Sequence, residues 1–228
     1  MKEVKTGKLI VIEGASDGIG KTTQYKLLQE HFQADGLKCV THHFPTYYSY
    51  QGKAVEKYLS GEYGDPKDLS PYFINNLYAY DRMITWHTKL EPEYKKGRIL
   101  LMDRYTTSSL IYQTALLKTM REKKAFLNYV TDFEYRKLGT HEPDTVIFLH
   151  APLELVNKMR AARTTNEGNI TNDIHEHNIE YLQEVYNNAM FVADYLGWEM
   201  INCATPKGRN MRTPEDIHAE IYQKLQVS

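Results

Sequence analysis

Short apolar runs alternate with amphipathic stretches along this chain. Five runs of β-branched and other apolar residues predict buried strands over 9–13, 38–44, 98–102, 145–149 and 198–202. Apolar residues between them recur at helical spacing, which predicts helices over 21–33, 71–90, 108–117, 122–137, 153–163, 173–195 and 214–227, and a shorter one inside 47–63. Strands that alternate with helices favour a three-layer α/β fold, in which helices cover both faces of a parallel five-stranded sheet.

The chain shows no internal boundary. No repeat, low-complexity tract or linker divides its 228 residues, so we expect a single domain over 1–228. The segment 164–171 is polar and contains Gly168, which predicts a loop or mobile tip between two helices. With the end of the preceding helix, it is expected to form a small mobile lid over about 160–172.

Composition narrows the range of partners. Hydrophobic residues make up 42% and charged residues 25% of the chain, and its formal net charge is -1. No overall positive field would attract nucleic acid or anionic lipid. We therefore expect neither nucleic acid nor a membrane as a partner, and an anionic substrate would need local cations.

The cysteines and the first residues bear on the cellular compartment. Cys39 and Cys203 lie near predicted strands, so we expect two buried thiols in a reducing compartment rather than a disulfide scaffold. The apolar run within MKEVKTGKLIVIEG is too short for a signal peptide or a membrane span. These features predict a cytoplasmic enzyme.

A glycine-rich turn, EGASDGIGKTTQ, follows the first predicted strand and opens the first predicted helix. Backbone N–H groups in such a loop point at phosphate oxygens, and the helix N-terminus adds positive potential. Gly18 and Gly20 permit the close approach of a phosphate, Lys21 can reach the β- and γ-phosphates, and Thr22 can bind Mg²⁺. A plain strand–helix turn is the alternative.

This loop is one residue longer than the usual pattern. Ala15 stands where glycine is usual and Gly14 stands one place earlier, so the path of the chain there is open. The residues expected to bind ATP are Ser16, Gly18, Ile19, Gly20, Lys21, Thr22 and Thr23.

The run RILLMDRY ends the third predicted strand in an Asp-Arg pair. Ligands of parallel sheets bind at the carboxyl ends of the strands, so Glu13, Phe44 and Asp103 are expected along one edge. Beside the phosphate loop, Asp103 could hold Mg²⁺ directly or through water, and Arg104 could bridge phosphates. A surface salt bridge at the strand end is the alternative.

Several segments, in this order, resemble the thymidylate kinase family of P-loop nucleoside monophosphate kinases. They are the phosphate loop, FPTYYS at 44–49, YAYDR at 78–82, DRYTTSSLIYQ at 103–113, EPDTVIFLHAP at 142–152 and TPEDIHAEIY at 213–222. Together they cover almost the whole chain. The resemblance implies a P-loop NTPase-like fold, ATP and Mg²⁺, a homodimer, and transfer of the γ-phosphoryl group of ATP to dTMP.

The resemblance also implies an acceptor pocket. Tyr78 and Arg82 lie four residues apart and so share a helix face. Tyr78 would stack on thymine, Arg82 would contact the base or the phosphate, and Asp17 would accept a hydrogen bond from the 3′-hydroxyl. A core ring is the alternative for Tyr78, and a helix salt bridge is the alternative for Arg82. The remaining residues expected in the dTMP pocket are Phe44, Arg104, Ser108, Tyr112 and Gln113, with plain core packing as the alternative for Phe44.

Two arginines lie at the start of the expected lid. Arg160 and Arg163 share a helix face, and the phosphate loop contains no arginine. The chain therefore resembles the family members that place the catalytic arginine in the lid, where it offsets charge on the transferring phosphoryl group. We favour Arg163, which lies nearer the tip; a solvated basic helix end is the alternative. The expected catalytic set is Asp17, Lys21, Arg104, Arg160 and Arg163.

One position departs from the family. An arginine often follows the Phe-Pro pair there, whereas this chain has Thr46 followed by tyrosines. Either Arg82 and Arg104 suffice for the acceptor phosphate, or the acceptor site is altered. A related kinase acting on another monophosphate, or on a deoxynucleoside with Glu13 as base, remains an alternative. So does a nucleotide-dependent switch, although the chain has no N-K-x-D guanine motif.

Overall fold

The computed structural model of the protein describes residues 7–158 and 179–225. Its sheet has five parallel strands in the order β2-β3-β1-β4-β5, as the alternating pattern predicts. The strands are β1 (Lys8–Gly14), β2 (Cys39–His43), β3 (Ile99–Asp103), β4 (Thr145–His150) and β5 (Glu199–Asn202).

The helices that precede β4 are α1 (Lys21–Ala34), α2 (Lys53–Leu59), α3 (Pro71–Thr85), α4 (Glu91–Lys95), α5 (Thr106–Ala115) and α6 (Met120–Thr131). Residues 153–158 are also helical, and α8 (Ile179–Tyr195) and α9 (Pro214–Leu225) follow. The expected lid at 160–172, with Arg160 and Arg163, lies outside the described residues.

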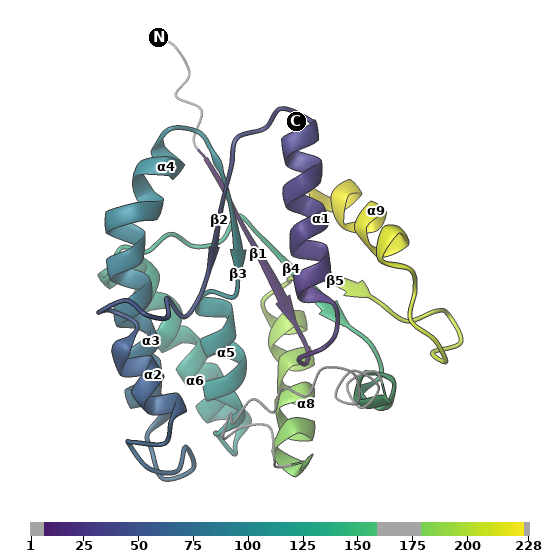
Figure 1. The fold of residues 1–228 in the computed structure, drawn as a ribbon. Coiled ribbons are helices and arrows are strands. Elements are labelled where there is room, and N and C mark those ends of the chain that lie inside the picture. The colour runs from purple at the N-terminus through teal and green to yellow at the C-terminus, as the bar shows by residue number, and fades with distance from the viewer. Residues whose placement is uncertain (1–6, 159–178, 226–228) are drawn as a thin grey trace.

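The central strand β1 divides the core into two sides. Ile10 and Ile12 pack with α1 and α9, while Leu9 and Val11 contact the opposite cluster around Trp86. Alternate residues of a strand point to opposite faces, so this run of four fully buried residues fills both sides. Figure 1 shows the resulting three layers, with α1 and α9 on one side of the sheet and α3, α5 and α6 on the other.

Two of the predicted helices are not regular. The stretch expected as one helix over 71–90 becomes α3 followed by a π-helical segment, η1 (Trp86–Leu90). Likewise α6 passes into η2 (Asp132–Lys137), a second π-helical segment. Apolar spacing cannot distinguish these turns from α-helix, because a π-turn shifts the buried face by only one residue.

The cysteines are both free. Cys203 is buried as expected, whereas Cys39 is half-buried, because it begins β2 at the edge of the sheet. Among the described residues, no helix combines the length and apolar character needed to cross a membrane.

Candidate active site

Three strand ends meet at one edge of the sheet. Ile12 of β1 and His43 of β2 both lie opposite Asp103 of β3 in the strand register. This pairing brings the loop after β1, the Phe44–Pro45 turn after β2 and Arg104 after β3 to the same place. The edge predicted from the strand ends is therefore present.

The loop between β1 and α1 contains two glycines in unusual backbone conformations. Gly18 and Gly20 adopt positive φ angles of 83° and 107°, which side-chain-bearing residues rarely reach. Gly20 caps α1 without a side-chain hydrogen bond, so the first N–H groups of the helix lack a side-chain partner in this part of the chain. Such N–H groups suit a phosphate anion.

The additional residue of the loop is absorbed at the end of β1. Ala15 is buried, and its backbone N–H donates to the carbonyl of Leu149 at 2.9 Å, extending the strand pairing. At Gly14, a Cβ atom would lie 2.7 Å from Cγ2 of Ile19. The chain therefore needs glycine there, one place before the usual position, to let Ile19 pack beneath the loop.

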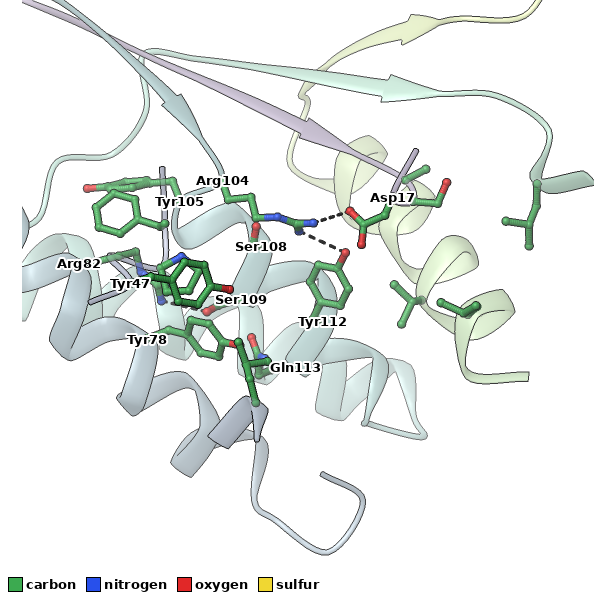
Figure 2. Close-up of a pocket in the computed structure, with 18 residues that line it drawn as sticks. Asp17, Tyr47, Tyr78, Arg82, Arg104, Tyr105, Ser108, Ser109, Tyr112 and Gln113 are labelled. Carbon is green, nitrogen blue, oxygen red and sulfur yellow. Dashed lines mark hydrogen bonds and ion pairs between the residues drawn. The ribbon is translucent and has the colours of Figure 1, made fainter. Parts of the chain in front are cut away.

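Two cations converge on Asp17. Its Oδ1 accepts hydrogen bonds from Nζ of Lys21 at 2.9 Å and from Nη2 of Arg104 at 2.5 Å. Arg104 also donates to the hydroxyl of Tyr112 at 3.2 Å, as Figure 2 shows. The backbone of Arg104 has a φ of 67°, an arrangement that costs on the order of 1–3 kcal/mol and is found where a site requires it.

Asp103 is the candidate ligand for a cation. Its Oδ2 contacts Nδ1 of His43 at 3.0 Å, while its buried Oδ1 has no hydrogen-bond partner among the described residues. Burial acts to raise the pKa of Asp103, but His43, Arg104 and Lys21 outweigh it and lower that pKa below its usual value. The group is therefore a carboxylate with one oxygen unused.

These residues fit Mg²⁺. The unused Oδ1 of Asp103 and the exposed hydroxyl of Thr22 are oxygen donors beside the phosphate loop. No group of three or more His, Cys, Asp or Glu side chains in the described ranges could hold a metal ion alone. The two oxygens of Asp103 and Thr22 fit Mg²⁺, which usually takes one or two protein oxygens and completes its shell with phosphates and water.

A pocket opens beside Arg104, and its walls are mostly apolar. It contains all the residues expected to bind the acceptor, namely Asp17, Phe44, Tyr78, Arg82, Arg104, Ser108, Tyr112 and Gln113. Figure 2 shows the two ends of this pocket, with Arg104, Asp17 and Tyr112 at one end and Arg82, Tyr78 and Ser109 at the other. An elongated ligand would therefore meet one guanidinium at each end, Arg104 beside Tyr112 at the first and Arg82 beside Tyr78 at the second.

A family model for thymidylate kinase matches residues 12–213, which include the phosphate loop, the Asp103–Arg104 strand end and every residue lining this pocket. The chain belongs to the thymidylate kinase family. Members are ATP-dependent nucleoside monophosphate kinases, so this chain is an enzyme of that class with nucleotide substrates.

Similar sequences and a similar solved structure are also thymidylate kinases. A thymidylate kinase of Brachyspira hyodysenteriae is 30% identical over 183 residues, which are 80% of each chain. A probable thymidylate kinase of Pyrococcus abyssi is 28% identical over 216 residues, which are 94% of each chain. The solved structure of Candida albicans thymidylate kinase has the same fold, with a TM-score of 0.70 over 97% of this chain and 92% of that one at 18% identity.

Within this thymidylate kinase fold, Arg82 is fully buried rather than part of a surface helix salt bridge. Its Nε donates to Oε2 of Glu134 at 2.7 Å, and its Nη2 donates to Oε1 at 2.6 Å. Burial acts to lower the pKa of Arg82, but the charge of Glu134 and its hydrogen bonds raise it above its usual value. Arg82 thus reaches the pocket as a fixed cation.

Thr46, at the position where the family often has arginine, is engaged elsewhere. Its N–H donates to Oδ2 of Asp81 at 2.6 Å, and its hydroxyl contacts His42 at 3.0 Å and Thr85 at 3.2 Å. The neighbouring Tyr47 lines the pocket instead. In the described chain, the cations that line the pocket are therefore Arg82 and Arg104.

Two buried carboxylates, Glu13 and Glu134, bind residues that line the pocket. Glu13 is fully buried, and its Oε2 accepts from the hydroxyls of Thr107 at 2.9 Å and Ser108 at 2.6 Å. Ser108 therefore lines the pocket with its hydroxyl already donated to Glu13. Glu134 was not expected from the sequence, because it lies in a predicted helix between Phe133 and Tyr135 and its partner Arg82 is 52 residues away.

Proposed function

We propose that this enzyme transfers the γ-phosphoryl group of ATP to dTMP, giving dTDP and ADP. The observation that carries the proposal is the convergence of Lys21 and Arg104 on Asp17 at the mouth of an apolar, aromatic-lined pocket. An aspartate between two cations leaves them next to each other and ready for phosphate oxygens. The phosphate loop supplies one anion site, and the pocket supplies the second.

The donor side is assigned to the phosphate loop. The residues Ser16 to Thr23 would hold the ATP phosphates through backbone N–H groups, and Lys21 would contact the β- and γ-phosphates. Thr22 and Asp103 would hold Mg²⁺, which supplies charge neutralisation at the phosphates when bound. The buried Oγ of Ser16, for which the described structure records no partner, fits this role.

The acceptor side is assigned to the pocket. Thymine would lie against Tyr78 and Phe44 with Arg82 at its edge, while Arg104 would bind the monophosphate. Tyr112 and Gln113 would contact the nucleoside, and Asp17 would turn from the two cations to the sugar 3′-hydroxyl. Core packing, the alternative for Phe44, is compatible with this role, because Phe44 is both buried and part of the pocket wall. Tyr78 is only half-buried and lines the same pocket.

The chemical step needs no general base. An oxygen of the acceptor monophosphate, anionic at neutral pH, attacks the γ-phosphorus in line, and the β-phosphate oxygen of ADP leaves. Lys21 and Arg104 offset the charge that spreads over the transferring group. Arg160 and Arg163 remain predicted lid residues for the same purpose.

A homodimer and a cytoplasmic location also remain predictions. The apolar helices around Tyr78 and Leu110 are the sequence's candidates for the dimer interface. Leu110 is buried in the core of a single chain, whereas Phe73 and Tyr80, on the helix of Tyr78, are 41% and 43% exposed. We therefore place the expected dimer contact on the exposed side of α3. Light scattering after gel filtration, on wild type and on Phe73→Ser, measures it; a monomeric wild type would remove this prediction.

A coupled ADP-release assay tests the function. Wild type is given ATP and Mg²⁺ with dTMP, dUMP, dGMP, UMP or thymidine in turn. We expect the highest kcat/KM with dTMP and negligible ADP release without an acceptor. A preference for thymidine would move the reaction to the 5′-hydroxyl, and acceptor-independent hydrolysis would favour a switch; either result would overturn the proposal.

A further inference from the structure

A buried ion pair lies behind the pocket. Arg82 and Glu134 are 1% and 0% exposed, and the carboxylate binds the guanidinium through both oxygens. Arg82 comes from α3 and Glu134 from η2, so the pair joins two elements far apart in sequence. A buried charge pair of this kind is seldom the most stable solution for a core, so its retention calls for another reason.

Glu134 is itself held in place. Its Oε2 also accepts from the hydroxyl of Thr106 at 2.9 Å. Its backbone carbonyl accepts from the N–H of Thr140 at 3.0 Å and from the hydroxyl of Thr140 at 2.7 Å. The carboxylate therefore has little freedom, and it passes that restriction on to the guanidinium it binds.

The geometry leaves one edge of Arg82 for the pocket. Nε and Nη2 point at Glu134, and Nη2 also donates to Oγ of Ser109 at 2.9 Å. Nη1 donates no hydrogen bond within the described ranges, although Arg82 lines the pocket beside Tyr78 (Figure 2). A guanidinium has only donors, so a ligand atom at Nη1 must be an acceptor.

We propose that Glu134 is a positioning residue that turns the Nη1 edge of Arg82 into the acceptor pocket and thereby selects bases that present a carbonyl oxygen over bases that present an amino group. The inference rests on the proposed function, because it concerns the base of the same acceptor. A thymine or uracil offers a carbonyl oxygen at its outer edge, where cytosine offers an amino group. Facing Nη1, that amino group would leave two donors opposed and unpaired, which a buried site penalises strongly.

The test compares dTMP with dCMP. Glu134→Gln keeps the size of the side chain, but it removes the charge and places an amide N–H₂ against the guanidinium or Thr106. We expect kcat/KM for dTMP to fall about 10–100-fold and the dTMP/dCMP ratio of kcat/KM to fall at least about fivefold. KM for ATP should change less than about twofold, because the pair lies on the acceptor side.

Matched variants separate positioning from stability. Ile217→Val weakens the core beside α9, away from the pocket, and should lower thermal stability without changing the dTMP/dCMP ratio. In an Arg82→Met background, Glu134→Gln should change the ratio no further, because Glu134 acts through Arg82. If Glu134→Gln does not fold, Thr106→Val, which removes one hydrogen bond to the carboxylate, should shift the ratio in the same direction.

Opposite results would overturn the inference. A folded Glu134→Gln variant with an unchanged dTMP/dCMP ratio of kcat/KM would show that Glu134 has only a structural role. A wild-type enzyme that prefers dCMP would also reject the inference. Failure of the kinase proposal is seen separately, as absence of turnover with every acceptor. Calorimetric affinities for thymidine and deoxycytidine need no turnover, and an equal affinity for both in wild type would still reject the role of Glu134.

Discussion

We expect Lys21 to act both in the free protein and in the nucleotide complex. Without a nucleotide, it neutralises Asp17 together with Arg104, which keeps two cations close to each other at the mouth of the pocket. With phosphate present, the same cations have better partners, because phosphate oxygens carry more charge than a shared carboxylate. Asp17 is 47% exposed, so solvent accommodates its release at small cost.

Lys21→Met should therefore damage catalysis more than folding. The change keeps the aliphatic stem and removes the charge, so we expect turnover to fall by on the order of 10²–10³ while the melting temperature changes by only a few degrees. Lys26→Met, at an exposed position of the same helix, is the matched control. ADP release and thermal melts measure both; a Lys21→Met enzyme with most of its activity would reject the assignment.

His42 makes stability depend on pH. Burial lowers its pKa from 6.5 to about 4, with Lys89 and His43 acting in the same direction and Asp81 opposing them. The folded state therefore keeps His42 neutral, and its Nε2 contacts the hydroxyl of Thr46 at 3.0 Å. The unfolded chain binds the proton more readily, so stability is lost as the pH falls from about 6.5 toward 4.

His42→Gln should remove this loss. Glutamine can still contact Thr46 but does not titrate, so the drop in unfolding free energy between pH 7 and pH 4.5 should be smaller by about 2–3 kcal/mol. Urea denaturation of both proteins at the two pH values provides the measurement. Equal drops in wild type and variant would show that His42 is protonated in the folded state.

The sequence predicts the position of a residue, though not its tested role, where a local motif fixes the geometry. The phosphate loop and the Asp103–Arg104 pair could be placed because a strand end and a glycine pattern carry the information. The pairing of Glu134 with Arg82 and that of Thr46 with Asp81 could not, because the partners lie 52 and 35 residues away. A buried ion pair across such a separation leaves no periodic trace in the sequence.

At the scale of elements, the strands were predictable because they are short apolar runs that end at turns. The two π-helical segments were not, and they matter because η2 carries Glu134 and η1 follows the helix of Arg82. A π-turn inserts one residue into a helix and redirects the side chains near it. One partner of the buried ion pair, Glu134, thus lies in an irregular element, while the other, Arg82, lies in the regular helix α3.

The start and end of α1 provide a matched pair of glycines. Gly20 has a φ of 107° at the start and Gly36 a φ of 70° beyond the end, and a Cβ at either would meet no atom within 4 Å. Alanine at either position therefore carries only the backbone cost of about 1–2 kcal/mol. The two sites differ only in their distance from the phosphate loop.

Gly20→Ala should weaken ATP binding, whereas Gly36→Ala should weaken folding alone. In Gly20→Ala, the free loop should relax away from the positive φ that the phosphate-binding conformation requires. ATP binding must then restore that conformation at a cost of about 1–2 kcal/mol, which lowers ATP affinity about 5–30-fold. Gly36→Ala should leave KM for ATP within about twofold. Steady-state kinetics with varied ATP, together with urea denaturation, separate these outcomes, and equal KM values for the two variants would contradict the role of Gly20.

At the scale of the whole molecule, the order β2-β3-β1-β4-β5 makes β1 and β3 neighbours, so the proposed donor and acceptor sites share one sheet edge. The sequence predicts this edge, because parallel strands end on the same side. What it does not supply is the depth of the pocket, which depends on how α3, α5 and α8 pack around it. The α5–α8 contacts join segments more than 60 residues apart along the chain, and the α3–α5 contacts join segments more than 20 residues apart.

Two sites on one sheet should stabilise the fold separately. A ligand at 100 times its Kd adds about 2.7 kcal/mol to the free energy of unfolding, or a rise of roughly 5–10 °C in melting temperature for a chain of this length. We expect a non-hydrolysable ATP analogue and dTMP each to produce such a rise. Lys21→Met should reduce the rise with the ATP analogue but keep most of that with dTMP, and Tyr78→Ala should show the reverse. If either variant lost both rises equally, the loop and the pocket would be one site, and the division into donor and acceptor sides would fail.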